Sequence, residues 1–112
     1  MHDLADPVAV LAAMRRMVRP GGTVLVVDEK VAERFTAPGD AIERLMYGFS
    51  VTCCLADGLS TRPSAGTGTV MRPATLERYA REAGFTGVDF TGVDVLPVEH
   101  DIFRFYRLRT EA

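Results

Sequence analysis

Apolar residues recur at spacings of three and four in three stretches of the chain, and this is the period of an amphipathic helix. The first helix is expected over residues 7–18, after a capping residue at Asp6 and before Pro20-Gly21-Gly22. The second is expected over 41–56 and the third over 73–83, where Gly84-Phe85 is typical of a helix end. The positions predicted to face the core share this spacing: Val8, Leu11, Ala12 and Met14; Ile42, Leu45, Met46, Phe49 and Cys53; Leu76, Tyr79, Ala80 and Ala83.

Three other stretches have the composition of strands. Residues 23–28 (TVLVVD) include four consecutive apolar residues without alternation, so both faces are expected to be covered, as in an inner parallel strand. Asp28 and Glu29 follow at its carboxyl end, where open α/β sheets bind ligands. Residues 88–95 and 102–108 flank a turn, which predicts an antiparallel pair.

Three details of the strands and loops bear on the site. Val88, Phe90, Val93 and Val95 are the apolar positions of the first strand of the pair, and Gly92 marks a bulge in it. Arg104 and Tyr106 are expected to share one face of the last strand, with the guanidinium reaching outward. The segment 59–72 is rich in Ser, Thr and Gly and is expected to be a lid or a flexible linker.

The order of these elements predicts one α/β domain over residues 1–112. It has about three strands, one of parallel type and two forming an antiparallel pair, and three main helices. An inner parallel strand needs a neighbour on each edge. The edge of strand 23–28 is therefore expected to pair with a second copy of the chain or with a partner chain.

Composition narrows the class of protein. The 112 residues include 13 Lys+Arg and 15 Asp+Glu and are 47% hydrophobic, so an ordinary core is expected and nucleic-acid binding gains no support. No apolar run approaches the ~20 residues of a membrane span. Asp3 and Asp6 stand where a secretory signal would be basic, and the adjacent Cys53 and Cys54 indicate no zinc site. The expected location is the cytoplasm.

Residues 2–29 (HDLADPVAVLAAMRRMVRPGGTVLVVDE) resemble the fourth-to-fifth-strand region of class I S-adenosylmethionine-dependent methyltransferases. In that family an L-x-P-G-G motif precedes a strand ending in Asp or Glu, and residues 18–22 (VRPGG) stand for the motif here. Residues 81–85 (REAGF) resemble the end of the helix before strand six. Residues 102–108 resemble strand seven, the antiparallel strand between strands five and six. The resemblance covers residues 2–109 and implies the C-terminal half of a Rossmann-like methyltransferase fold.

The resemblance implies a methyltransferase, or a fragment of one, that acts on a small organic acceptor. The family binds S-adenosylmethionine through a glycine-rich turn and an acidic residue in its first half, and neither has a counterpart here. Residues 66–68 (GTG) lack the third glycine of such a turn. Cofactor binding by this chain alone is therefore not expected, and a truncated gene product is one explanation. A non-catalytic α/β domain that acts through assembly is the alternative function.

His2 is the candidate catalytic residue. In small-molecule O-methyltransferases a His-Asp-aromatic motif follows strand four, and residues 2–4 (HDL) match its first two positions. The resemblance implies that His2 is the base toward an acceptor hydroxyl, a role that suits imidazole because its pKa lies near neutrality. An unordered terminal histidine is the alternative, and Asp3 is a candidate to orient the ring.

The helix over 41–56 occupies the place where the family covers its acceptor. Five residues of it are candidates for an apolar acceptor pocket, with an ordinary core stripe as the alternative: Met46, Tyr47, Phe49, Ser50 and Cys54.

Overall fold

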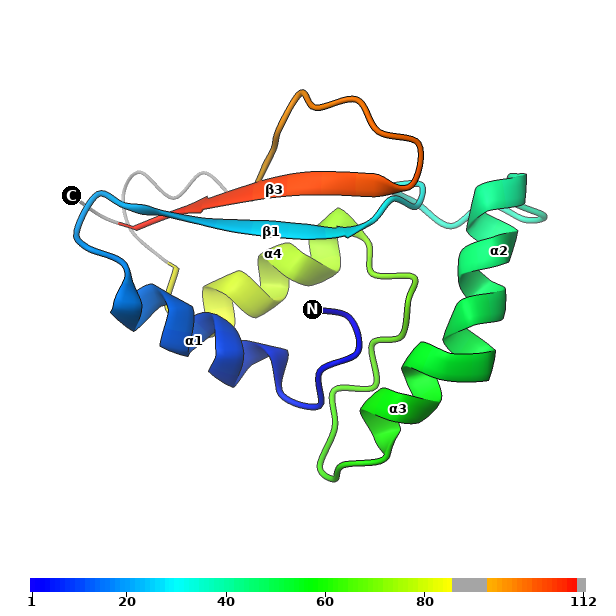
Figure 1. Cartoon of the computed structure of the whole chain (residues 1–112), viewed down its shortest axis with the longest axis horizontal. Helices are drawn as coiled ribbons and strands as arrows, with labels where there is room; N and C mark the ends of the chain where they lie inside the picture. Colours follow the sequence, from blue (N-terminus) through cyan, green and yellow to red (C-terminus); the bar gives the residue numbers. More distant parts are fainter. Residues whose placement is uncertain (86–92, 111–112) are drawn as a thin grey trace.

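The structure is a computed structural model that describes residues 1–85 and 93–110. Its elements are α1 (Pro7–Met17), β1 (Thr23–Glu29), α2 (Ala41–Phe49), the π-helix η1 (Ser50–Cys54), α3 (Leu55–Leu59), α4 (Pro73–Glu82), β2 (Asp94–Val95) and β3 (Phe103–Arg109). Helices α1 and α4 lie on one face of the sheet, whereas α2 and α3 stand beside it (Figure 1). The predicted α/β class is confirmed.

Both predicted N-caps are confirmed. The Asp6 carboxylate accepts a hydrogen bond from the Ala9 N–H at 2.8 Å, at the start of α1. The Asp40 carboxylate accepts one from the Glu43 N–H at 2.8 Å, at the start of α2. Each bond satisfies a backbone donor that a helix leaves unpaired at its first turn.

The predicted end of α4 is also confirmed. Gly84 has a φ of 90°, a conformation that an L side chain would strain. It allows the Phe85 N–H to donate to the Ala80 carbonyl at 2.9 Å, and Phe85 is then 1% exposed against the core.

The sheet has the order β1-β3-β2, and β3 runs antiparallel to both neighbours. The prediction that β1 is an inner parallel strand covered on both faces is wrong. Among the described strands it pairs only with β3, from Thr23 opposite Arg109 to Glu29 opposite Phe103. Its burial alternates, and the outward Leu25 and Val27 are 64% and 49% exposed. Valine-rich strands have the same local preference whether one face or both are covered, so the sequence did not distinguish the two.

The predicted antiparallel pair is present where it is described. Asp94 lies opposite Arg107, and Val95 lies opposite Tyr106. The predicted strand positions Val88 and Phe90 and the bulge at Gly92 lie outside the described residues.

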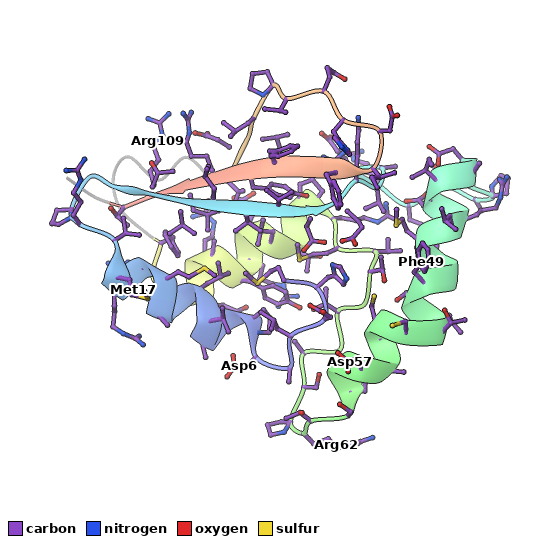
Figure 2. All side chains as sticks on the ribbon, viewed as in Figure 1. Asp6, Met17, Phe49, Asp57, Arg62 and Arg109 are labelled. Carbon is purple, nitrogen blue, oxygen red and sulfur yellow. The ribbon has the colours of Figure 1, made fainter. Side chains whose placement is uncertain are left out.

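The core fills the space between the sheet and the helices α1 and α4 (Figure 2). Its buried residues are Leu11, Val24, Val26, Met71, Leu76, Tyr79, Ala80, Ala83, Phe85, Tyr106 and Leu108. The core positions predicted for the third helix are confirmed. The segment 59–72 is irregular, as predicted, but it is not a free linker, because Thr69 and Met71 at its end are 1% and 0% exposed.

The second predicted helix continues to Leu59 through the π-helical turn η1. Its predicted apolar stripe is wrong in most positions: Leu45 and Phe49 are 48% and 49% exposed and Cys53 is exposed, while Met46 is buried. The stripe failed because α2 does not lie against the face of the sheet.

The inward side of α2 is instead partly polar. Glu43 is buried at 3% exposure and accepts a hydrogen bond from Arg72 Nη1 at 2.6 Å. The same Nη1 donates to the Ala32 carbonyl, and Nη2 donates to the Tyr47 hydroxyl at 3.2 Å. Arg72 thus connects α2 to the loop after β1 and to the start of α4.

Candidate functional site

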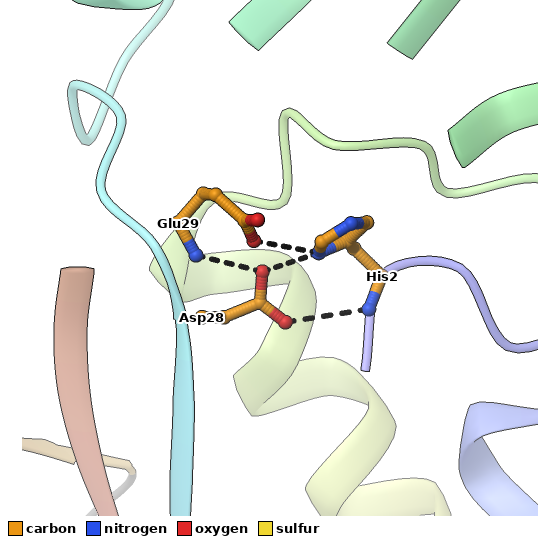
Figure 3. A group of neighbouring side chains, drawn as sticks. All are labelled: His2, Asp28 and Glu29. Atoms are coloured by element: carbon orange, nitrogen blue, oxygen red, sulfur yellow. Dashed lines mark hydrogen bonds and ion pairs between the residues drawn. The ribbon is translucent and has the colours of Figure 1, made fainter. Parts of the chain in front are cut away.

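His2 lies beneath the carboxyl end of β1 and is 8% exposed (Figure 3). The segment before α1 enters the space between the sheet and the helices, where the N-terminus lies in Figure 1. The alternative of an unordered terminal histidine is therefore wrong.

Two consecutive carboxylates hold the imidazole. His2 Nδ1 lies 2.5 Å from Asp28 Oδ1 and 3.0 Å from Glu29 Oε2. The second oxygen of Asp28 accepts the His2 backbone N–H at 3.3 Å, so this carboxylate fixes both the ring and the main chain. The prediction that Asp3 orients the ring is wrong, since its side chain is 48% exposed and the ring is bound by Asp28 and Glu29.

Strand β1 positions this cluster. Asp28 belongs to the buried face of β1, after Val24 and Val26, and is 2% exposed. Its Oδ1 also accepts the Glu29 N–H at 2.9 Å, which fixes the carboxylate at the end of the strand. The strand therefore presents a charged group on its core face just where the segment carrying His2 passes beneath it.

The two partners shift each other's pKa in opposite directions. The hydrogen bond to Asp28 is the largest influence on His2 and raises its pKa to about 9, against the opposing effect of burial. Burial works to raise the pKa of Asp28, but the hydrogen bonds from His2 and Glu29 outweigh it and lower that pKa to about 2. Burial raises the pKa of Glu29 as well. At neutral pH the pair is therefore an imidazolium and a carboxylate.

The side chains of this cluster are also close enough together to bind a cation. Ligand atoms of His2, Asp28 and Glu29 all lie within 4.8 Å of one another. In the structure, the positive charge between the carboxylates of Asp28 and Glu29 is that of the His2 imidazolium. A metal ion would have to displace the proton from Nδ1 before the nitrogen could bind it.

Two of the pocket candidates lie in η1. The Cys54 side chain is one of the influences that raise the pKa of His2. Ser50 is 7% exposed, and its hydroxyl accepts the Thr69 N–H at 3.2 Å. Because a π-helical turn widens the helix by one residue, it alters which side chains face inward at this point.

The other pocket candidates differ in burial, and among the described residues none of them forms a hydrogen bond with His2. Met46 is 3% exposed, which fits the alternative of an ordinary core residue. Tyr47 is 40% exposed with its hydroxyl bound to Arg72, and Phe49 is 49% exposed.

The glycines of residues 66–68 do not form a cradle for a cofactor. A Cβ on Gly68 would collide with Ser50 Oγ, so this glycine allows the loop to pack against η1. Gly66 and Gly68 have positive φ angles of 59° and 76°, so both glycines are needed for the backbone conformation of the loop. The segment therefore does not fit the adenosyl cofactor that the resemblance implies.

The sequence singled out His2, Asp28 and Glu29 separately, but it did not connect them. The available signal was the position of both carboxylates at the carboxyl end of a strand, the usual place for ligands in α/β sheets. A separation of 26 residues between His2 and Asp28 has no local pattern that could reveal the contact.

The sequence matches no protein-family model, and a search of the curated proteins found no significant match. Within the described part of the chain, no helix combines the length and apolar character needed to cross a membrane. The cluster of His2, Asp28 and Glu29 is the feature from which a function can be argued.

Proposed function

We propose that this chain is the C-terminal half of an S-adenosylmethionine-dependent methyltransferase that acts on a small organic acceptor, with His2 as its general base. The observation that carries the proposal is the buried imidazole held by Asp28 and Glu29 at the carboxyl end of β1. Binding through Nδ1 orients the ring, and Nε2 is the nitrogen that would act as the base.

The strand order supports the same proposal. The order β1-β3-β2, with the middle strand antiparallel to both neighbours, corresponds to the order of strands five, seven and six that the resemblance implies. In that correspondence Asp28 and Glu29 end strand five, and His2 follows strand four.

The chemistry of His2 follows from its contacts. Nε2 of the neutral ring would take the proton of an acceptor hydroxyl, and the resulting positive charge would be stabilised by Asp28 and Glu29. Because its pKa is about 9, only a small fraction of His2 is neutral at pH 7. The fraction of active base then rises about tenfold per pH unit until the pH reaches the pKa.

The test is transfer of a radiolabelled methyl group from S-adenosylmethionine to small hydroxyl compounds, with the whole polypeptide that the gene encodes. His2→Gln is expected to lower the rate by about 10²–10⁴-fold, the usual contribution of a general base. The matched control is His100→Gln, because His100 is the other histidine of the chain and is exposed. An unchanged rate in His2→Gln, or no transfer by the whole polypeptide, would contradict the proposal.

Residues 1–112 alone are expected to show no binding of S-adenosylmethionine in isothermal titration. A micromolar dissociation constant would contradict the inference that the cofactor-binding half lies elsewhere.

A second candidate function is assembly, proposed because β1 lies at the edge of the sheet. Its backbone groups on that edge are not paired within the described strands, and Leu25 and Val27 are exposed beside them. A second copy of the chain could pair with this edge about a two-fold axis and extend the sheet. Light scattering after size-exclusion chromatography tests it, and a stable monomer at micromolar concentration would contradict it.

A further inference from the structure

A cavity of about 290 Å³ lies where β1 leaves the sheet and α2 begins. Two cationic residues, Lys30 and Arg104, contribute to its wall. Val31 and Ile42 supply apolar surface, so the cavity offers both charge and a hydrophobic contact. Asp40 and Asp101 also line it.

Arg104 is held on the inner face of the sheet. It lies opposite Asp28 in the register of β1 and β3 and precedes Tyr106, which is fully buried on the same face. The expectation that its guanidinium reaches outward is wrong, because Nη1 is buried.

The buried donors of this face are unsatisfied. Among the described residues, neither Arg104 Nη1 nor the Tyr106 hydroxyl has a hydrogen-bond partner of ordinary geometry, although the two side chains are close enough for Arg104 to oppose the rise that burial causes in the pKa of Tyr106. A buried donor without an acceptor is costly, more so when it is charged, and native proteins rarely keep one. Arg104 as a whole residue is only partly buried, and it lines the cavity, so it combines an unused donor with a position at the cavity wall.

The charged side chains that line the cavity differ in the partners that they have within the protein. No carboxylate of the described residues forms an ion pair with Lys30 or Arg104. Of the two carboxylates of the wall, Asp40 uses one oxygen to cap α2, and Asp101 is exposed. The Lys30 N–H donates to the Ile102 carbonyl at 2.8 Å, which fixes its backbone beside β3.

We propose that this cavity binds a small organic anion, with its carboxylate or phosphate group on Arg104 and Lys30 and its apolar part on Val31 and Ile42. A guanidinium suits this role because its planar set of donors matches the oxygens of both groups. The proposal concerns binding alone and does not depend on methyl transfer.

The test is a titration of the chain with benzoate, phenyl phosphate and benzamide. Binding is measured by calorimetry and by the shifts of the amide resonances of residues 30–32. Benzamide has the shape of benzoate without its charge. Saturable binding of at least one anion is expected, at least about tenfold tighter than that of benzamide, since hydrogen bonds to a charged acceptor are stronger than those to a neutral one. The tighter of the two anions identifies the oxyanion class.

Arg104→Gln is expected to weaken binding of the anion at least tenfold. Arg107→Gln is the matched control: it removes the same charge from the same strand, but Arg107 pairs with Asp94 at 3.0 Å and does not line the cavity. Thermal unfolding of each variant reports whether it is folded. If Arg104→Gln does not fold, Lys30→Gln is measured instead and is expected to weaken binding at least threefold.

Three results would overturn the proposal. The first is the absence of saturable binding by either anion, and the second is equal affinity for benzoate and benzamide. The third is an equal loss of affinity in Arg107→Gln and in the folded cavity variant.

Discussion

At the scale of single residues, the main feature of the candidate site is that the His2 imidazole is protonated. His2 is held between Asp28 and Glu29, and the raised pKa of about 9 makes the imidazolium the stable form at neutral pH. The amino group of Met1 lies 3.4 Å from Asp28 Oδ2, and the Cys54 side chain also helps to raise the pKa of His2. The histidine is therefore both a structural cation and a candidate base.

This dual role predicts a pH dependence of stability. Because the pKa of His2 is raised by folding, its contribution is fully present below the unfolded pKa of 6.5 and is lost as pH rises through about 9. The melting temperature of the wild type is expected to exceed that of His2→Gln by a margin that shrinks between pH 6.5 and 10.

The control for this prediction is Val51→Ala, which should give a margin that stays constant with pH, because Val51 is 74% exposed and carries no titratable group. The comparison is repeated in Cys54→Ser, since the Cys54 thiol contributes to the pKa of His2. A constant margin for His2→Gln over the whole range would contradict the imidazolium assignment.

At the scale of elements, one ion pair holds α2 in place. Glu43 is the buried partner, and Arg72 connects it to the loop after β1 through the Ala32 carbonyl. Nearby apolar residues of α2, such as Leu45 and Phe49, are half exposed and add little burial. The attachment of this helix therefore depends more on charge and hydrogen bonds than on an apolar stripe.

Arg72→Met is expected to destabilise the fold by about 3–5 kcal/mol, because it leaves the carboxylate of Glu43 buried without its cation. Urea unfolding of the variant measures this change. Arg78→Met is the control, since Arg78 pairs with Glu82 on the exposed side of α4 and an exposed pair is worth about 0–1 kcal/mol. Equal effects of the two substitutions would contradict the role of Arg72.

At the scale of the whole molecule, the sheet is covered by helices on one face, while its other face is partly exposed. Helices α1 and α4 cover the face that carries Val24 and Val26 (Figure 1). The opposite face of β1 presents Leu25 and Val27, next to an edge that no described strand occupies. This combination is the structural basis of the assembly proposal.

Leu25→Lys is expected to shift a dimer toward monomer, because a lysine beside an exposed strand edge opposes pairing. Light scattering over a range of concentrations measures the shift, with a loss of affinity of at least tenfold expected. Met17→Lys is the control, since Met17 is 85% exposed and lies on α1, not on a strand (Figure 2). A dimer of unchanged affinity in Leu25→Lys would contradict pairing through β1.

The sequence by itself determined the local structure of this protein. Caps at Asp6 and Asp40, the end of α4 at Gly84 and the period of its apolar residues are all recorded within a few neighbouring positions. The apolar run of β1 did not indicate whether one or both faces of the strand are covered, because strand propensity is the same in either case.

Only the tertiary structure decided which groups meet. It brought His2 to Asp28, turned the polar side of α2 toward Arg72 and buried the guanidinium of Arg104. The first two are contacts between residues far apart in the chain, and burial strengthens their electrostatic interactions by excluding water. The residues that carry the chemistry could be named from the sequence, but their pairing and protonation depend on the folded arrangement.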